Sequence, residues 1–368
     1  MLSCSKYKSA FLHGCKYMER QMGAHFPRIG LHAQFQLYLE LSTRCNMKCS
    51  YCDLWHQDHS GEVEPERWKA VLPELLDVLG QPKINFSGGE PLLSPVIFDL
   101  LQICVERGAY PGFVTNGRLL NQENVERLAR LNVANINISL DDDRPEIFDH
   151  VRRAPGHTEL LLSNIASLQK ALQEHRCNTV VYLKSVVHAE NADRLVHMVK
   201  LAEGNRCTIT FQPLSSPFGR PFKPDWYKSE PLWPVGDRLS ALQREIDNLI
   251  AMKKQNAPIG NSINEMERWH QYFEAPEQHQ KNNDDSPCLI GYNNLYIFSN
   301  GDVKYCPTRP KVGNIKDQGI HDILMSKKSE NEIVNMRKCR GNACVKTCMA
   351  QRSLSEMVAL FFKFVNKK

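Results

Sequence analysis

The sequence predicts an α/β fold built around a parallel β-sheet. Between about residue 35 and residue 215, short segments rich in β-branched and aromatic residues alternate with segments whose apolar residues recur at helical spacing. Repeated βα units of this kind form right-handed crossovers, in either a doubly wound sheet or an incomplete barrel. Both architectures place ligands at the carboxyl ends of the strands. The candidate motifs of this region all follow predicted strands.

The predicted elements are short and bounded by turns. The strands are FQLYLEL (35–41), KINF (83–86), YPGFVTN (110–116), ANINISL (134–140), TVVYLKSVV (179–187) and TITFQPL (208–214). The first helix is predicted from Trp68 to Leu79, with a kink at Pro73 and its end at Gly80. The other helical patterns span 94–107, 122–131, 158–174 and 191–203.

Five segments are expected along the chain. An N-terminal helical extension (1–34) precedes the βα core (35–215). A connector rich in proline and aromatic residues follows (216–285) and carries one predicted helix, RLSALQREIDNLIAMKK. A small cysteine-rich module (286–350) and a basic amphipathic C-terminal helix (351–368) come last.

The composition is that of an ordinary soluble globular protein. The 368 residues are 42% hydrophobic and 24% charged, and a net charge of +5 is mild for this length, so no nucleic-acid partner is expected. No apolar run reaches the roughly 18 residues of a membrane span, and charges interrupt the N-terminus too often for a secretory signal. We therefore predict a cytoplasmic protein without stable membrane insertion. Thirteen cysteines in that reducing compartment indicate bound metal rather than disulfides.

The strongest motif is a loop of three cysteines directly after the first strand. Cys45, Cys49 and Cys52 are separated by three residues and then by two. A zinc site completed by His56 and a redox pair of Cys49 and Cys52 are two interpretations. The third is a [4Fe–4S] cluster held by three cysteines, which leaves one iron open to a substrate or cofactor. The pattern favours the cluster.

The spacing Cys-x3-Cys-x2-Cys, with Tyr51 just before the last cysteine, resembles the radical S-adenosylmethionine (SAM) superfamily. The resemblance covers residues from about 35 to 350 and implies an enzyme with an incomplete (β/α)6 TIM-like barrel and a small C-terminal Cys-rich auxiliary iron–sulfur domain. In that family the open iron chelates SAM, and one electron cleaves SAM to methionine and a 5′-deoxyadenosyl radical that takes hydrogen from the substrate. Tyr51 is one of the implied SAM contacts.

A second motif follows the second strand. Gly88 and Gly89 lack a Cβ and permit close approach of a ligand, and Glu90 can accept a bond from an ammonium group. Together with Pro91 they resemble the Gly-Gly-Glu-Pro motif with which the family binds the methionine amine of SAM.

The resemblance implies further SAM contacts at the ends of later strands. Asn116 would meet the nucleoside, and Ser139 with Asp141 resembles the ribose-binding pair. Arg152 lies where the family often places an arginine for the SAM carboxylate, although a helix-surface charge is the alternative. Gln212 would neighbour the adenine.

The C-terminal module contains five cysteines and a hairpin signal. Asn300-Gly301 lies between alternating apolar residues, which predicts a tight turn that brings the following strand back along the first. A Cys4 zinc ribbon would satisfy the cysteine count. The arrangement also resembles the SPASM and twitch extensions of radical SAM enzymes, which implies one auxiliary [4Fe–4S] cluster. The candidate ligands are Cys288, Cys306, Cys339, Cys344 and Cys348.

Five cysteines for one cluster leave a spare among Cys339, Cys344 and Cys348. That thiol is either structural or a hydrogen-atom donor to a substrate radical, as in epimerases of the family. The other cysteines are expected to be buried or inert; they are Cys4, Cys15, Cys104, Cys177 and Cys207.

Two substrate classes stay open. One is a ribosomally made peptide or other natural product that is epimerised, crosslinked or oxidised, and the other is a small molecule such as a sugar or aminocyclitol. Only residues 1–34 precede the first strand, where peptide-modifying relatives often carry a leader-binding domain. The aromatic residues Trp226, Tyr227 and Trp233 could line either kind of site. An electron donor such as flavodoxin or ferredoxin is implied, and a zinc-stabilised scaffold without catalysis is the remaining alternative.

Overall fold

The computed structural model describes residues 36–216, 219, 223, 225–277, 288, 290–336, 338 and 339. The predicted N-terminal helical extension (1–34) and C-terminal helix (351–368) lie outside the described residues, as do Cys4, Cys15, Cys344 and Cys348.

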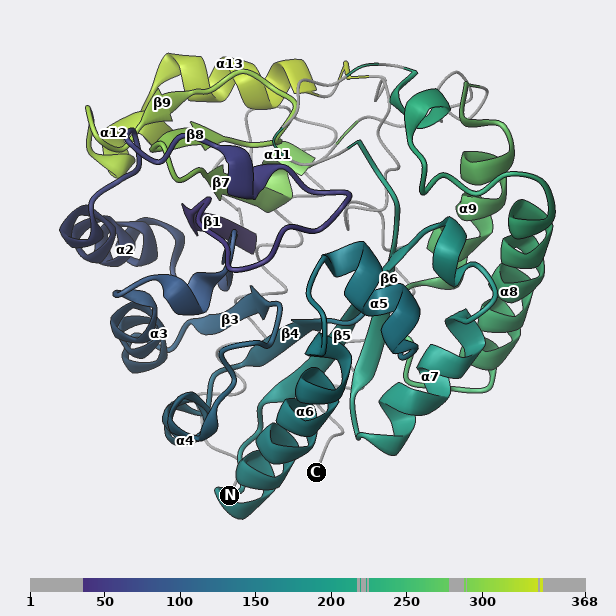
Figure 1. The fold of residues 1–368 in the computed structure, drawn as a ribbon. Coiled ribbons are helices and arrows are strands. Elements are labelled where there is room, and N and C mark those ends of the chain that lie inside the picture. Colours follow the sequence, from purple (N-terminus) through teal and green to yellow (C-terminus); the bar gives the residue numbers. More distant parts are fainter. Residues whose placement is uncertain are drawn as a thin grey trace.

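The six predicted strands form one parallel array, in the order β6-β5-β4-β3-β2-β1. This confirms the α/β fold class. Among the described strands the sheet stays open. β6 lies at one edge, and on the other side β1 is paired with a further strand of the C-terminal module (Figure 1). The bounds are β1 Gln36–Ser42, β2 Lys83–Gly88, β3 Tyr110–Thr115, β4 Asn135–Ser139, β5 Val180–Val187 and β6 Thr208–Pro213.

Helices cover the outer side of the curved sheet, as Figure 1 shows. Their apolar residues and the buried alternate residues of the strands, such as Leu37 and Leu39, form one hydrophobic core. α2 contains Pro73 and ends at Gly80, whose φ of 73° suits glycine. A short helix before α6, α5 (Pro145–Arg152), was not predicted. Besides α5, the helices on this side of the sheet have the bounds α2 Pro65–Leu79, α3 Ile97–Glu106, α4 Gln122–Leu131, α6 His157–Glu174 and α7 Leu195–Gly204.

The connector contains a second helix besides the predicted α8 (Gly236–Lys254). This helix, α9 (Ile263–Glu274), begins where the Ser262 side chain accepts a hydrogen bond from the Glu265 amide. Its apolar residues recur at helical spacing and are buried: Met266, Trp269, Tyr272 and Phe273.

The aromatic residues of the connector pack against α9. Trp226 and Tyr227, in η4 (Trp226–Ser229), contact the ring of Trp233, which in turn contacts Tyr272 and Phe273. Trp233 is only 7% exposed. This cluster therefore forms a local core between η4 and α9.

The C-terminal module extends the core sheet. β7 (Asn294–Ile297) pairs in parallel with β1, and the chain then turns through Asn300-Gly301 into antiparallel β8 (Asp302–Lys304), as the hairpin signal predicted. β9 (Gly313–Asn314) pairs with β8. The helices of the module are α11 Ile290–Asn293, α12 Ile320–Met325 and α13 Lys327–Met336. Across the described ranges, no helix is long and apolar enough to cross a membrane.

Candidate active site

The three cysteines lie in the loop that leaves the carboxyl end of β1. The Cys52 amide donates to the carbonyl of Cys49, and the Ser50 amide donates to the carbonyl of Val151 at the end of α5. All three thiols are partly exposed. Burial raises the pKa of Cys45 to about 11, and the nearby thiols of Cys49 and Cys52 contribute to that rise. The three predicted cluster ligands therefore lie on one loop at the carboxyl end of β1.

The base of the loop is fixed by Glu62, which the sequence reading did not single out. Its carboxylate accepts hydrogen bonds from the Thr43 amide at 2.7 Å, from the Thr43 hydroxyl at 2.9 Å and from the Ser42 hydroxyl at 2.9 Å. Nothing in the local sequence marks this glutamate. These bonds hold residues 42–43 in place directly before Cys45.

Gly88 and Gly89 lie against the cysteine loop. The Gly89 amide donates to Ser42 O at 2.8 Å and the Glu90 amide donates to Arg44 O at 2.9 Å. A Cβ at residue 88 would lie 2.1 Å from Ser42 O. The close approach that these glycines permit is therefore to the backbone of the loop.

Glu90 is buried and joins this loop to the end of β3. Its carboxylate accepts bonds from the Thr115 hydroxyl at 2.8 Å, the Asn116 amide at 2.8 Å and the Leu92 amide, within η2 (Pro91–Leu93), at 3.1 Å. Burial raises the pKa of Glu90 to about 7, although the three hydrogen bonds partly offset this rise. The predicted bond from Glu90 to the amine of SAM stays a prediction.

Asn116 reaches the cysteine loop from β3. Its side-chain nitrogen donates to the Asn46 side chain at 2.8 Å and lies 3.9 Å from Cys45 Sγ. The imidazole of His157 contacts the Asn116 carbonyl at 3.0 Å. This position beside the cysteines agrees with a site at the carboxyl ends of the strands.

Arg152, Asp141 and Tyr51 form a buried cluster beside Cys49. Arg152 donates two bonds to the Asp141 carboxylate, at 2.8 and 2.9 Å, and Tyr51 donates one at 2.7 Å. Burial raises the pKa of Asp141, but the charge of Arg152 together with the hydrogen bonds from Arg152 and the Val186 amide outweighs it, so the pKa lies below its usual value. Arg152 is only 6% exposed, so the alternative of a helix-surface charge is wrong.

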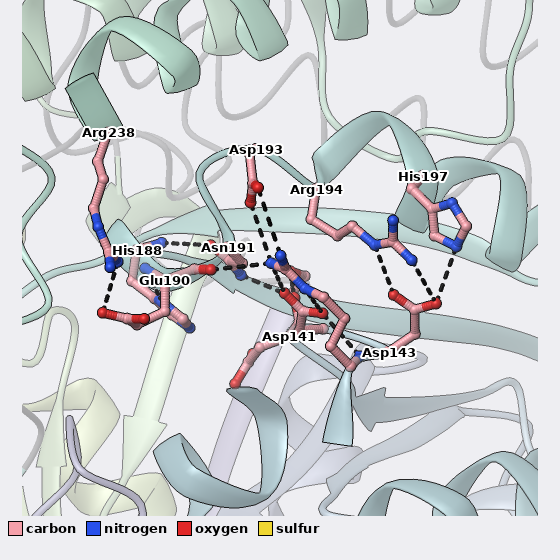
Figure 2. A network of polar contacts seen from close by, with 12 residues as sticks. Asp141, Asp143, His188, Glu190, Asn191, Asp193, Arg194, His197 and Arg238 are labelled. Atoms are coloured by element: carbon pink, nitrogen blue, oxygen red, sulfur yellow. Dashed lines mark hydrogen bonds and ion pairs between the residues drawn. The ribbon is translucent and has the colours of Figure 1, made fainter. Parts of the chain in front are cut away.

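The segment from Asp141 to Asp143 is held by a larger polar network (Figure 2). Asn191, in η3 (Ala189–Asn191), donates to Asp141 O at 2.8 Å. Arg194 bonds both oxygens of Asp143, and His197 lies 3.0 Å from the same carboxylate. The network fixes the backbone that carries Asp141.

His188, which follows β5, is a buried residue that the sequence reading missed. Its Nδ1 accepts from the Glu190 amide, and no hydrogen-bond partner for its Nε2 occurs among the described residues. Its ring centroid is 6.3 Å from that of Tyr51. In the sequence, the position of His188 directly after a predicted strand is the feature that could have marked it as a site residue. The other predicted contacts, Ser139 and Gln212, lie at the ends of β4 and β6.

In the C-terminal module, Cys306 follows β8 and Cys339 follows α13. Arg309 is bonded to Glu332 at 2.6 Å, and the charges of Cys306 and Cys339 add to the rise in its pKa. Both thiols therefore lie within electrostatic range of the same guanidinium. Cys288 is partly buried just before α11, whereas Cys344 and Cys348 lie outside the described residues. Elsewhere, Cys104 and Cys207 are buried as expected, and Cys177 is partly buried.

The donor set at β1 suits an iron–sulfur cluster. Each thiolate of such a cluster binds a different iron, so the sulfurs need not converge on one point. Within the described ranges, no three His, Cys, Asp or Glu side chains converge closely enough for a single metal ion. Polar hydrogens of Asn116 and Arg152 lie near the sulfurs of Cys45 and Cys49, as hydrogen bonds to cluster ligands do.

Residues 39–202 match the model of the radical SAM superfamily, and residues 288–350 match that of an iron–sulfur cluster-binding domain, SPASM. The chain is therefore a radical SAM enzyme with a C-terminal iron–sulfur domain. Its cofactors are a [4Fe–4S] cluster with SAM and auxiliary iron–sulfur.

Two curated relatives and one solved structure illustrate the similarity. The AdoMet-dependent heme synthase of Methanosarcina barkeri is 26% identical over 77% of this chain and 80% of the relative. The PqqA peptide cyclase of Streptomyces rochei is 33% identical over 48% of this chain, which spans 46% of that relative. The fold resembles Streptococcus suis SuiB with a TM-score of 0.60 and 16% identity, covering 89% of this chain and 74% of SuiB. SuiB was also solved with its precursor peptide SuiA.

Proposed function

We propose that this enzyme generates a 5′-deoxyadenosyl radical from SAM and abstracts hydrogen from a peptide, with epimerisation, crosslinking or oxidation as the outcome. The supporting observation is the likeness of the fold to SuiB, which extends over 89% of the chain. The solved complex of SuiB with its precursor peptide and the 33% identity to a PqqA peptide cyclase both favour a peptide.

Each group of site residues has its own proposed role. Cys45, Cys49 and Cys52 hold the cluster, which with SAM supplies the electron transfer and the radical. The glycines at 88 and 89 fix the backbone of the cysteine loop. The proposed SAM contacts along the strand ends are Tyr51, Gly88, Gly89, Glu90, Pro91, Asn116, Ser139, Asp141, Arg152 and Gln212. Glu90, Asp141 and Arg152 also order the loops around the site. The auxiliary cluster is proposed on Cys288, Cys306 and two of Cys339, Cys344 and Cys348.

A small-molecule substrate is the second candidate. One observation favours it: the heme synthase is matched over 80% of its own length, whereas the Streptomyces peptide cyclase is matched over 46%. The small-molecule class would include porphyrin precursors of heme.

The radical chemistry is tested by anaerobic reconstitution with iron and sulfide. We expect about eight irons per chain natively and about four in a Cys45/Cys49/Cys52→Ala variant, as two four-iron clusters and one would give. Dithionite-reduced native protein should release 5′-deoxyadenosine from SAM, and the variant should not. Two zinc ions per chain without SAM cleavage would support the scaffold instead.

The substrate class needs a separate experiment. The chain is coexpressed with short peptides encoded beside its gene, and each peptide is examined by mass spectrometry for a changed mass or an altered residue configuration. The matched control is coexpression with the triple cysteine variant. A modified peptide only with the native enzyme supports the peptide proposal. Unmodified peptides together with conversion of a porphyrin precursor to heme would favour the second candidate.

A further inference from the structure

The guanidinium of Arg152 lies between a carboxylate and a cysteine sulfur. Its Nε and Nη2 donate to Asp141, while Nη1 lies 3.7 Å from Cys49 Sγ. This distance is within the range of an N–H···S hydrogen bond. Each of the three guanidinium nitrogens therefore has a partner: Nε and Nη2 contact the carboxylate, and Nη1 contacts a predicted cluster ligand.

The position of the guanidinium is fixed from several sides. Asp141 also accepts bonds from the Tyr51 hydroxyl and the Val186 amide, so its carboxylate is held independently of Arg152. The rings of Tyr51 and Phe148 lie 5.3 and 5.5 Å from the guanidinium carbon. At the end of α5, the bond from the Ser50 amide to Val151 O ties the arginine segment to the cysteine loop.

The charge of Arg152 acts in a medium that screens it weakly. Asp141 is 1% exposed and Arg152 is 6% exposed, so little water lies between the guanidinium and the sulfur. Hydrogen bonds to cluster sulfurs and nearby charge are among the factors that set the potential of an iron–sulfur cluster. Reduction adds one negative charge to the cluster, and a neighbouring cation stabilises the reduced form.

We propose that Arg152 is a positioning residue that raises the reduction potential of the SAM-binding cluster by donating a hydrogen bond to the Cys49 thiolate. The predicted contact of Arg152 with the SAM carboxylate is a different role, since the bond to Cys49 exists without SAM. Asp141 orients the guanidinium and opposes its charge. The proposal rests on the radical SAM assignment and is independent of the substrate class.

The test measures the ratio of reduced to oxidised cluster, by electron paramagnetic resonance, in the reconstituted full-length enzyme without SAM. The signal of the SAM-binding cluster is the one absent from the Cys45/Cys49/Cys52→Ala variant. In Arg152→Gln we expect this ratio to fall about tenfold at a fixed potential, which corresponds to about 59 mV for one electron. Arg152→Lys keeps the charge and should give a smaller fall.

Two controls separate this effect from structural damage. Asp141→Asn removes the opposing negative charge and should shift the ratio in the other direction, whereas disruption of the site would move both variants the same way. Arg107→Gln breaks the ion pair with Asp77, between the ends of α3 and α2, and should leave the ratio unchanged. The auxiliary-cluster signal is the internal reference in every variant.

The proposal is overturned if Arg152→Gln retains the native ratio, even where its affinity for SAM falls, because the arginine would then act on SAM alone. An equal shift of both clusters would also overturn it. A failure of SAM cleavage in all variants, with the SAM-free shift intact, would count against the proposed function and leave this inference standing.

Discussion

The backbone of Gly89 lies against that of Arg44, and a Cβ at residue 89 would be 2.0 Å from the Arg44 carbonyl oxygen. No real Cβ tolerates such a distance from a backbone atom, so only glycine fits. The adjacent amide of Glu90 donates to the same carbonyl. The end of β2 thereby determines the path of the cysteine loop.

Gly89→Ala should displace the cysteine loop. The overlap with Arg44 O is a backbone contact that no side-chain rotation relieves, and we expect a loss of about 3 kcal/mol in the free energy of unfolding. Denaturant unfolding measures this, and iron content after reconstitution should fall towards that of the triple cysteine variant. Gly61→Ala is the control, because nothing lies within 4 Å of a Cβ at residue 61. Equal stability of the two variants would contradict the prediction.

Asn191→Ala should destabilise the segment around Asp141. The Asn191 side chain donates to Asp141 O and Val186 O, both at 2.8 Å, and accepts from the His188 amide. Its removal takes away three bonds at buried groups, with only the longer bond from the Ser185 hydroxyl left to Asp141 O, at a cost of about 3 kcal/mol in the free energy of unfolding. Asn205→Ala removes a single bond at a part-buried site and should cost about 1 kcal/mol. Thermal and denaturant unfolding of both variants compare the two costs; similar losses would argue against the network.

Stability should depend on pH through Glu90. Because burial raises its pKa to about 7 from the usual 4.5, the folded protein binds this proton more tightly than the unfolded chain does. The stability due to this proton is complete below the unfolded pKa and is lost as the pH rises through about 7, by about 3 kcal/mol in total. Unfolding free energies from about pH 4.5 to pH 8 should show this component in the native protein and not in Glu90→Gln. Parallel profiles would refute it.

Gly301→Ala should weaken the hairpin that precedes Cys306. Gly301 has a φ of 88°, and a Cβ there would lie 2.5 Å from the Asn314 side chain. We expect a cost of about 2 kcal/mol, and loss of the auxiliary signal before that of the SAM-binding cluster. Gly156→Ala carries a similar backbone strain, at φ 72°, without a neighbour within 4 Å, and is the matched control. Retention of the auxiliary signal during denaturation would speak against this order of loss.

Local sequence patterns were sufficient to predict most helices and strands and to indicate the family. Each strand and most helices have their own periodicity, the turn at Asn300-Gly301 depends on two adjacent residues, and the cysteine spacing lies within eight residues. Such signals need no knowledge of distant contacts. The second connector helix was missed although Met266, Trp269 and Phe273 carry a helical pattern, because the polar residues between them dominate the composition.

Contacts between distant segments were decided only by the tertiary structure. The pairing of β1 with β7 joins residues more than 250 positions apart, and no pattern in either strand selects its partner. The roles of Glu62 and His188, the backbone that Gly88 and Gly89 approach, and the placement of Arg152 beside Cys49 follow from the same assembly. The sequence alone determined which residues can bind a cluster, because ligand chemistry is a property of side chains and their spacing. Which charges lie next to that cluster depends on how the strand ends meet, and packing across the whole sheet fixes that arrangement.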